Sequence, residues 1–76
     1  MREAVEKLVR ALVTQPDAVE VTETGERGLT VFQVQVAAGE VGRLIGREGR
    51  TIRALRSLLN VAGQKQGRRY GLEIVE

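Results

Sequence analysis

Two glycines, Gly46 and Gly49, stand three residues apart between two segments whose apolar residues recur at helical spacing. Glycine has no Cβ, so backbone N–H groups at such a break can come close to a phosphate group. A helix that begins after Gly49 would also direct the positive end of its dipole toward the same point. Glycines at this spacing therefore predict a site that holds the phosphate backbone of a nucleic acid.

Basic side chains are concentrated around the two glycines. Residues 41–69 contain eight basic residues and one acidic residue, a local charge of +7 in a chain whose net charge is +2. Such a segment is the electrostatic footprint of a polyanion binder. Arg47 and Arg50 lie in the loop and at the start of the next helix, where phosphate contacts are expected. Arg43 and Arg53 are further candidates, with a solvated or ion-paired surface position as the alternative.

The composition argues against several other classes of protein. The chain has no histidine, no cysteine and one aspartate, Asp17, so it lacks the residues of a catalytic triad or a zinc site. We therefore predict a protein that is not an enzyme and that has no metal and no cofactor. No apolar run has the length of a membrane span, and the N-terminus lacks a signal-peptide pattern. We predict a cytoplasmic protein with one domain and no membrane contact.

The elements that must position the loop follow from hydrophobic periodicity. An amphipathic helix is expected to end before Pro16, and a turn at residues 25–28 is expected to join two strands as an antiparallel hairpin. Gly67 is expected to close the long helix. The predicted elements are helices at residues 2–14, 40–45 and 50–66 and strands at residues 19–24, 29–36 and 70–75.

The nine residues from Leu44 to Ile52, Leu-Ile-Gly-Arg-Glu-Gly-Arg-Thr-Ile, resemble the Ile-Gly-x-x-Gly-x-x-Ile signature of KH domains. The order α-β-β-α-α-β resembles the type II arrangement found in bacteria, and the resemblance covers nearly the whole chain. It implies an α+β fold with a three-stranded sheet covered on one face by three helices. It also implies that residues 1–76 form a single KH domain, like the small stand-alone KH proteins of bacteria.

The resemblance further implies that about four unpaired nucleotides lie along a groove, with the glycine loop clamping their backbone. Gly46 and Gly49 would be the positions of close approach, and Ile45 and Ile52 the apolar base of the groove, although both are expected to serve the core first. The complete set of predicted RNA-binding residues is Arg43, Ile45, Gly46, Arg47, Glu48, Gly49, Arg50, Ile52 and Arg53.

Glu48 departs from the family pattern, in which a basic or small residue is common at this position of the loop tip. A carboxylate beside a phosphate is unfavourable, so we expect Glu48 to point away or to pair with Arg47 or Arg50. Aromatic residues are scarce, and Phe32 is expected in the core. Stacking on aromatic rings is therefore not expected to dominate base recognition, which would rely on aliphatic packing and hydrogen bonds to base edges.

These observations predict an RNA-binding module, and the resemblance implies that it acts as an RNA chaperone or post-transcriptional regulator. The resemblance implies three partners: single-stranded RNA, a second copy of the chain, and a second RNA-binding protein. Two alternatives stay open from the residues alone. One is a protein-interaction or dimerisation module, because a domain of this size has a modest core. The other is a helix-turn-helix reader of duplex DNA, with residues 50–66 as its recognition helix.

Overall fold

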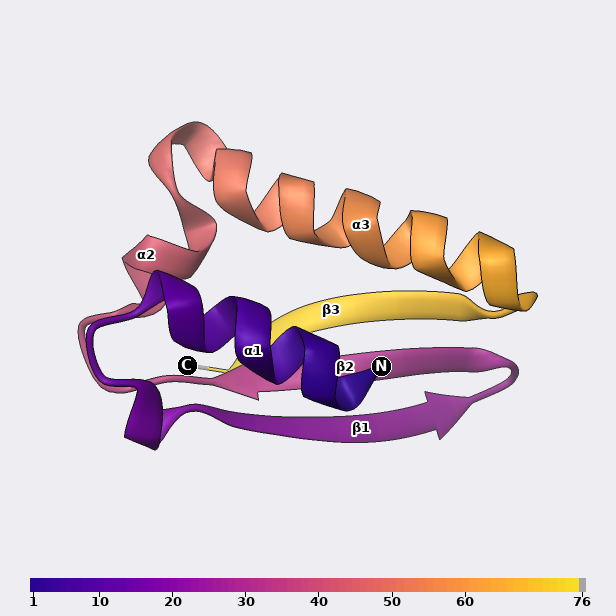
Figure 1. Ribbon diagram of the computed structural model, residues 1–76, viewed down its shortest axis with the longest axis horizontal. Helices are drawn as coiled ribbons and strands as arrows, with labels where there is room; N and C mark the ends of the chain where they lie inside the picture. The colour runs from indigo at the N-terminus through magenta and orange to yellow at the C-terminus, as the bar shows by residue number, and fades with distance from the viewer. Residues whose placement is uncertain (76) are drawn as a thin grey trace.

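The computed structural model describes residues 1–75, apart from the side chain of Glu26 (Figure 1). The order α-β-β-α-α-β that we predicted for a type II KH fold is confirmed. Two single-turn 3₁₀ helices interrupt it, at Pro16–Ala18 and Arg47–Gly49. The main elements are α1 (Arg2–Leu12), β1 (Glu20–Glu26), β2 (Leu29–Gln35), α2 (Val41–Ile45), α3 (Arg50–Gln66) and β3 (Arg69–Val75).

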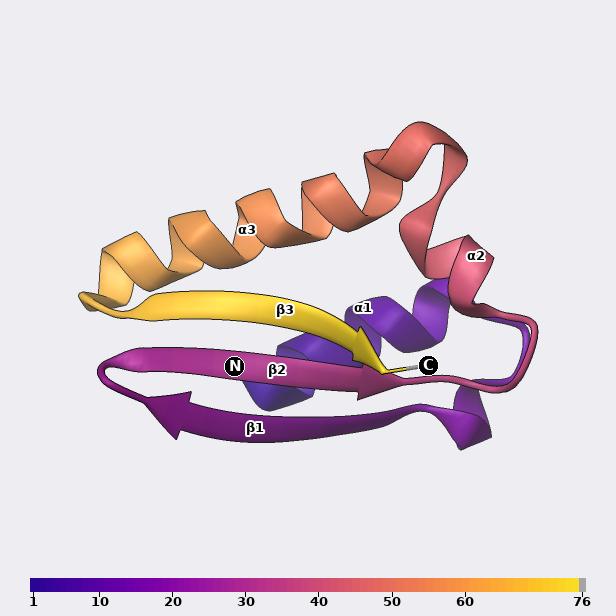
Figure 2. The same ribbon diagram turned by 180° about the vertical axis from the view of Figure 1, so that it is seen from behind.

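The three strands form one sheet in the order β1-β2-β3. β1 and β2 are antiparallel, with Glu20 opposite Gln35, and the predicted hairpin is thereby confirmed. β2 and β3 are parallel, with Leu29 opposite Arg69. Parallel neighbours need a long crossover connection, and α2, the glycine loop and α3 together provide it. β3 is consequently an edge strand, and the chain returns along the sheet beneath α3 (Figures 1 and 2).

The hairpin turn is tighter than the four residues predicted for it. β1 continues to Glu26, and only Arg27 and Gly28 lie between the strands. Both have positive φ, 51° and 82°, as the two central residues of a type I′ hairpin turn require. The predicted boundary was wrong because Arg27 adopts a left-handed conformation that the sequence pattern alone assigns to glycine or asparagine.

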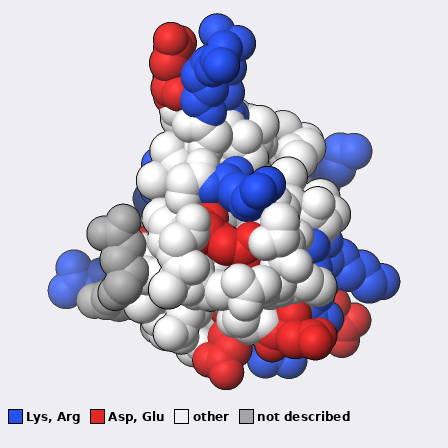
Figure 3. Space-filling model, turned by 90° about the vertical axis from the view of Figure 1, so that its left-hand side faces the viewer, with Lys and Arg blue, Asp and Glu red and all other residues white. Residues whose placement is uncertain are grey.

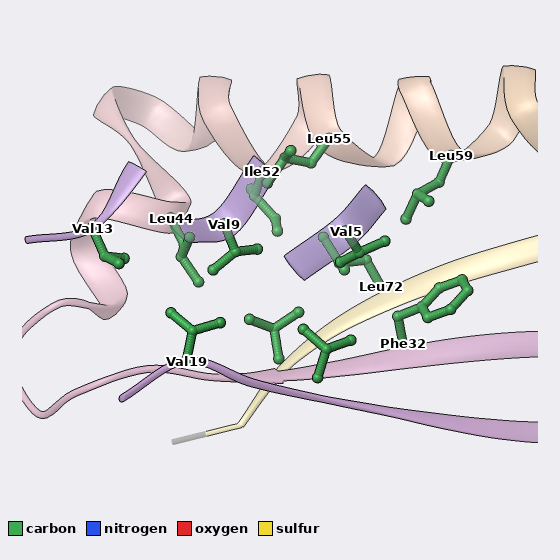
Figure 4. Close-up of a cluster of buried hydrophobic side chains, with 12 residues drawn as sticks. Val5, Val9, Val13, Val19, Phe32, Leu44, Ile52, Leu55, Leu59 and Leu72 are labelled. Carbon is green, nitrogen blue, oxygen red and sulfur yellow. The ribbon is translucent and has the colours of Figure 1, made fainter. Parts of the chain in front are cut away.

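The core lies between the sheet and two helices that cover the same face of it. α1 contributes Val5 and Val9, α3 contributes Ile52, Leu55 and Leu59, and the sheet contributes residues such as Phe32, Val34 and Leu72 (Figure 4). The ring of Phe32 also meets that of Tyr70 edge-on, at a centroid distance of 5.4 Å. These apolar contacts explain why the amphipathic faces predicted for the two long helices turn inward.

α2 differs from the expectation that three helices cover the sheet. It stands beyond the end of the sheet, whereas α1 and α3 lie over the strands (Figures 1 and 2). α2 still contributes to the core, because the Leu44 side chain is only 1% exposed. A helix of five residues is too short to span the strands, so it serves as a connection that leads the chain toward the glycine loop.

A buried carboxylate joins the end of α1 to the start of α2. Glu40 is 4% exposed and accepts hydrogen bonds from the backbone N–H groups of Thr14 (2.6 Å) and Gln15 (3.1 Å). The Thr14 hydroxyl also donates to it, and Arg43 Nε lies 3.7 Å away. These contacts explain why α1 ends at Leu12, two residues earlier than predicted, because the N–H groups that follow point to Glu40.

The hydrogen bond from the Thr14 side chain is the largest cause of a lowered pKa at Glu40, followed by the bond from the Thr14 backbone. Because the folded-state pKa lies below the ordinary value of 4.5, the carboxylate stabilises the fold above that pH. This contribution is lost as the pH falls through the folded-state pKa.

We predict that Glu40→Gln lowers the free energy of unfolding at neutral pH and makes it less dependent on pH between neutrality and the acid transition. The amide cannot be ionised, and its nitrogen cannot accept a hydrogen bond, so at least one of the three bonds is lost. Urea unfolding at a series of pH values measures both effects. Glu73→Gln, a change at an exposed carboxylate, is the matched control. Equal pH dependence in the wild type and Glu40→Gln would contradict the assignment.

Candidate nucleic-acid interface

The glycine loop is a run of unusual backbone conformations between two helices. α2 ends at Gly46, which has φ 75° and ψ 174°, and α3 begins directly after Gly49, which has φ 74° and ψ 16°. Glu48 also has positive φ, 57°. Three positive φ angles in four residues turn the chain sharply outward, and Figure 3 shows basic and acidic side chains side by side on the projecting tip.

The two glycines are required for different reasons. A Cβ on Gly46 would lie 2.8 Å from Thr51 Cβ and 2.9 Å from Thr51 N, so the loop backbone rests directly on the first turn of α3. Gly46 N–H also donates to the carbonyl of Gly42, which caps α2. At Gly49 the nearest atom to a Cβ would be 3.9 Å away, and only the backbone conformation favours glycine there.

Arg53 turns its guanidinium toward the loop. Its Nη2 donates to the carbonyl of Glu48 (2.7 Å) and its Nε to the carbonyl of Gly49 (3.3 Å). The loop carbonyls are therefore held from the helix side by a side chain of α3. Arg43 also has a partner within the protein, because it forms an ion pair with the buried carboxylate of Glu40. Two of the arginines predicted to bind RNA thus have partners within the protein.

Arg47 and Arg50 are the more available cations at the tip. Arg50 Nη2 lies 3.8 Å from Glu48 Oε2, and both side chains are more than 70% exposed. Of the arrangements left open for Glu48, the structure shows the pair with Arg50. An exposed ion pair of this kind is weak enough to exchange its partner. Arg47 is exposed, and no ion pair within the described part of the chain involves it.

Ile45 and Ile52, predicted as the apolar base of a groove, lie in different environments. Ile52 is 8% exposed and belongs to the core, where it packs with residues of α1 and the sheet. Ile45 is 38% exposed. Of the two isoleucines, Ile45 is therefore the one that a ligand at the loop can reach.

A shallow groove along the free edge of β3 was missed by sequence reasoning. It is lined by Arg56, Ser57 and Asn60 of α3 and by strand residues that include Gly71 and Glu73. Arg56 Nη2 donates to the carbonyl of Leu72 (3.3 Å) and so covers part of the strand edge. The spacing of the three α3 residues places them on one helix face, but only the strand order reveals that this face borders an edge strand.

Two further findings concern the described residues alone. No helix within residues 1–75 combines the length and the apolar character that crossing a membrane requires. The same residues contain no group of three or more histidine, cysteine, aspartate or glutamate side chains placed to hold a metal ion.

Comparison with known proteins identifies close sequence relatives. A family model described as "KhpA/KhpB, KH domain" matches residues 2–74. "RNA-binding protein KhpA" of Treponema pallidum is 42% identical over 74 residues, which cover 97% of this chain and 92% of the relative. The proteins of the same name from Aquifex aeolicus and Chlamydia trachomatis are 40% and 36% identical, and the matches cover all of this chain and 96% and 97% of theirs. No solved structure matches the chain.

We predict that Gly46→Ala destabilises the protein more than Gly49→Ala. Gly49→Ala should cost about 1–2 kcal/mol for a left-handed non-glycine residue. Gly46 lies in a region of φ and ψ that is essentially restricted to glycine, at about 1–3 kcal/mol, and its Cβ would also meet Thr51. Denaturant unfolding measures both, with Gly39→Ala as a control at positive φ in open space. If Gly46→Ala and Gly49→Ala lower the free energy of unfolding equally, the close approach of Gly46 to Thr51 is contradicted.

Proposed function

This chain belongs to the KhpA/KhpB family of KH domains, and we propose that it binds single-stranded RNA by holding phosphate groups at the Gly46–Gly49 loop. The observation that carries this proposal is the loop backbone, which turns outward at three positive φ angles directly before the N-terminus of α3. The relatives named above are described as RNA-binding proteins, which supports the same class of ligand.

The N-terminus of α3 supplies hydrogen-bond donors for a phosphate. The first N–H groups of a helix have no partner within it, and no side chain caps this end of α3. The N–H of Arg50 donates to the carbonyl of Arg47, so the donors for a phosphate are the N–H groups that follow it. The helix dipole adds a favourable field for an anion. Arg47 contributes its charge directly, and Arg50 does so by exchanging Glu48 for the ligand. Arg53 and Arg43 act indirectly, because their bonds to loop carbonyls and to Glu40 fix the backbone that carries the donors.

The groove along β3 provides the surface for the bases. Ser57 and Asn60 offer hydroxyl and amide groups that can bond to base edges, beside the aliphatic side chains of Leu29 and Val31. The ring of Tyr70 packs on Phe32, and its hydroxyl donates to Gln66 Oε1 (2.6 Å). Stacking on this ring is therefore a minor contribution, and hydrogen bonds with aliphatic contacts carry base recognition.

A second copy of the chain would raise the affinity. One loop of this kind binds at roughly 10⁻⁴–10⁻⁶ M, the range of non-specific phosphate binding, and two linked sites multiply that affinity. An apolar groove between α1 and α3 offers the interface, because Leu8 and Leu58 line it and are 43% and 57% exposed. Exposed apolar surface of this kind marks an interaction site. We propose a homodimer through this groove.

The family name also supports a KhpB-type RNA-binding protein as a second partner. We further propose that residues 1–76 act as one KH domain in the cytoplasm, without catalysis, as an RNA chaperone or post-transcriptional regulator. The alternative is a module that only binds protein through the groove between α1 and α3. Reading of duplex DNA by α3 is the less favoured alternative, because the apolar face of that helix is committed to the core.

We predict that Arg47→Gln/Arg50→Gln weakens binding to a short single-stranded RNA and reduces its dependence on salt. Each phosphate neutralised on a single strand contributes about 0.7 to the slope of log K against log salt, so removing two arginines reduces it by about 1.4. Arg2→Gln/Arg10→Gln removes the same charge from α1, outside the Gly46–Gly49 loop. Fluorescence anisotropy at several salt concentrations measures the slopes. Equal slopes in the two variants, or a preference for duplex DNA, would contradict the proposal.

We predict that Leu58→Glu converts a dimer into a monomer while the fold persists. A carboxylate in an apolar interface would lose its hydration without gaining a partner. Val75→Glu is the matched control, because Val75 is also exposed (41%) but lies on β3, outside the groove between α1 and α3. Multi-angle light scattering over a range of concentrations measures the mass. A wild-type protein that stays monomeric at every concentration would rule out the homodimer.

A further inference from the structure

β1 forms one edge of the sheet, and its outer side has no neighbouring element. In the strand order β1-β2-β3, β1 pairs with β2 alone. No helix or strand of the described chain lies along its other side in the two opposite views (Figures 1 and 2). The edge at β3 is partly covered, because Arg56 donates to the Leu72 carbonyl. At β1 the hydrogen bond found among the described side chains is that of Thr24 to the Val31 carbonyl, which is directed at β2.

The β1–β2 turn fixes which backbone groups of β1 face outward. A two-residue hairpin turn closes on a hydrogen-bonded pair, here Glu26 and Leu29, and such pairs alternate with non-hydrogen-bonded pairs along an antiparallel ladder. Every second residue of β1, counted back from Glu26, therefore bonds to β2. The N–H and C=O groups of Val21, Glu23 and Gly25 point away from the sheet, where they can bond to a further strand.

Negative charge is concentrated along this edge. Residues 11–26 contain four acidic residues and no basic residue, in a chain whose net charge is +2. Glu20 and Glu23 are both exposed, and neither belongs to an ion pair within the described residues. Side chains alternate between the two faces of a strand, and the side chain of Val21 is buried in the core. Glu23 therefore lies on the face that carries the helices, and Glu20 lies on the open face.

The charge of this edge decides between possible occupants. A second copy that paired its own β1 here would bring acidic residues together, and like charges across a strand pair are destabilising. A nucleic-acid backbone would be repelled by the same carboxylates. An extended peptide with basic side chains gains main-chain hydrogen bonds and charge pairs together. Because Glu20 and Glu23 are three residues apart, basic residues at that spacing place one charge on each face of the sheet.

We propose that the outer edge of β1 is a docking site for an extended basic peptide segment, which adds a fourth strand to the sheet. The segment has lysine or arginine residues three positions apart, and these pair with Glu20 and Glu23. Its backbone bonds to the outward groups of Val21, Glu23 and Gly25. The site lies on the opposite side of the molecule from the Gly46–Gly49 loop (Figure 1), and it does not depend on RNA binding there.

Amide hydrogen exchange measured by NMR tests the site with a synthetic peptide. The end-blocked peptide Thr-Lys-Val-Thr-Lys-Val-Thr has the length of β1 and two lysines three positions apart. In the free protein, the outward amides of Val21, Glu23 and Gly25 should exchange faster than those of Thr22 and Thr24, which bond to β2. With the peptide at about ten times its dissociation constant, exchange of the outward amides should slow about tenfold.

A control peptide tests the spacing of the charges. Thr-Lys-Val-Lys-Thr-Val-Thr has the same composition, but its lysines are two positions apart and lie on one face of an added strand. It can pair with Glu20 or with Glu23 and not with both. We therefore expect it to bind more weakly than the first peptide, by up to about fivefold for the lost charge pair. A chemical-shift titration measures both affinities.

Two substitutions of Glu23 separate the charge from the backbone bond. Glu23→Gln removes the charge and should lower the affinity for the first peptide by up to about fivefold. Glu23→Pro also removes the outward N–H, which an edge strand tolerates, so its affinity should fall further. Glu73→Gln removes an exposed carboxylate from β3 as the matched control. Arg47→Gln/Arg50→Gln, at the glycine loop, should bind the peptide as the wild type does. Thermal unfolding establishes that each variant is folded.

Two results would overturn the proposal. One is exchange of the outward amides that stays unchanged in a large excess of the first peptide. The other is equal affinity for the two peptides together with equal affinity of the wild type and Glu23→Gln, because binding would then ignore the acidic edge. If Glu23→Pro does not fold, the exchange measurement and Glu23→Gln still decide the question. Neither result bears on RNA binding at the glycine loop.

Discussion

The hydrogen bonds of one buried carboxylate tie the N-terminal helix to the segment that carries the candidate site. Glu40 receives the backbone N–H groups that follow α1 and stands directly before α2. A buried charge is strongly destabilising when its partners are removed, so the end of α1 and the start of α2 stay together. Because α2 leads straight into Gly46, the position of the glycine loop on the core depends on this contact.

The arginines around the loop divide into two roles. Arg43 and Arg53 bind groups of the protein itself, the Glu40 carboxylate and the carbonyls of the loop. Arg47 and Arg50 remain exposed at the tip, where they can meet a ligand. A rigid loop loses little conformational freedom when it binds, so in the proposed complex the first pair would support the affinity of the second. Part of the local charge of +7 therefore has partners within the protein, and only part of it belongs to the proposed binding surface.

Strand order places a groove along one edge of the sheet. β3 joins the sheet at its edge, next to α3, and the groove on its free side adjoins the hollow beside the β1–β2 turn. An exposed edge strand carries unpaired backbone N–H and C=O groups, so it can pair with other chains and cause aggregation. Here Arg56 bonds to the Leu72 carbonyl and so covers part of that edge.

Local patterns in the sequence determined the helices, the hairpin and the glycine loop, because periodicity, turn residues and glycine spacing act over a few neighbouring residues. They also determined the class of ligand we propose, since the glycines and arginines are adjacent in the chain. Contacts between distant residues decided the rest. Glu40 meets Thr14 across 26 positions, and β3 pairs in parallel with β2, which lies far earlier in the chain. That packing decided that Ile52 faces the core and not a groove. It also decided which arginines have partners within the protein and which are exposed to a ligand. Side-chain burial and hydrogen-bond partners are properties of the assembled fold.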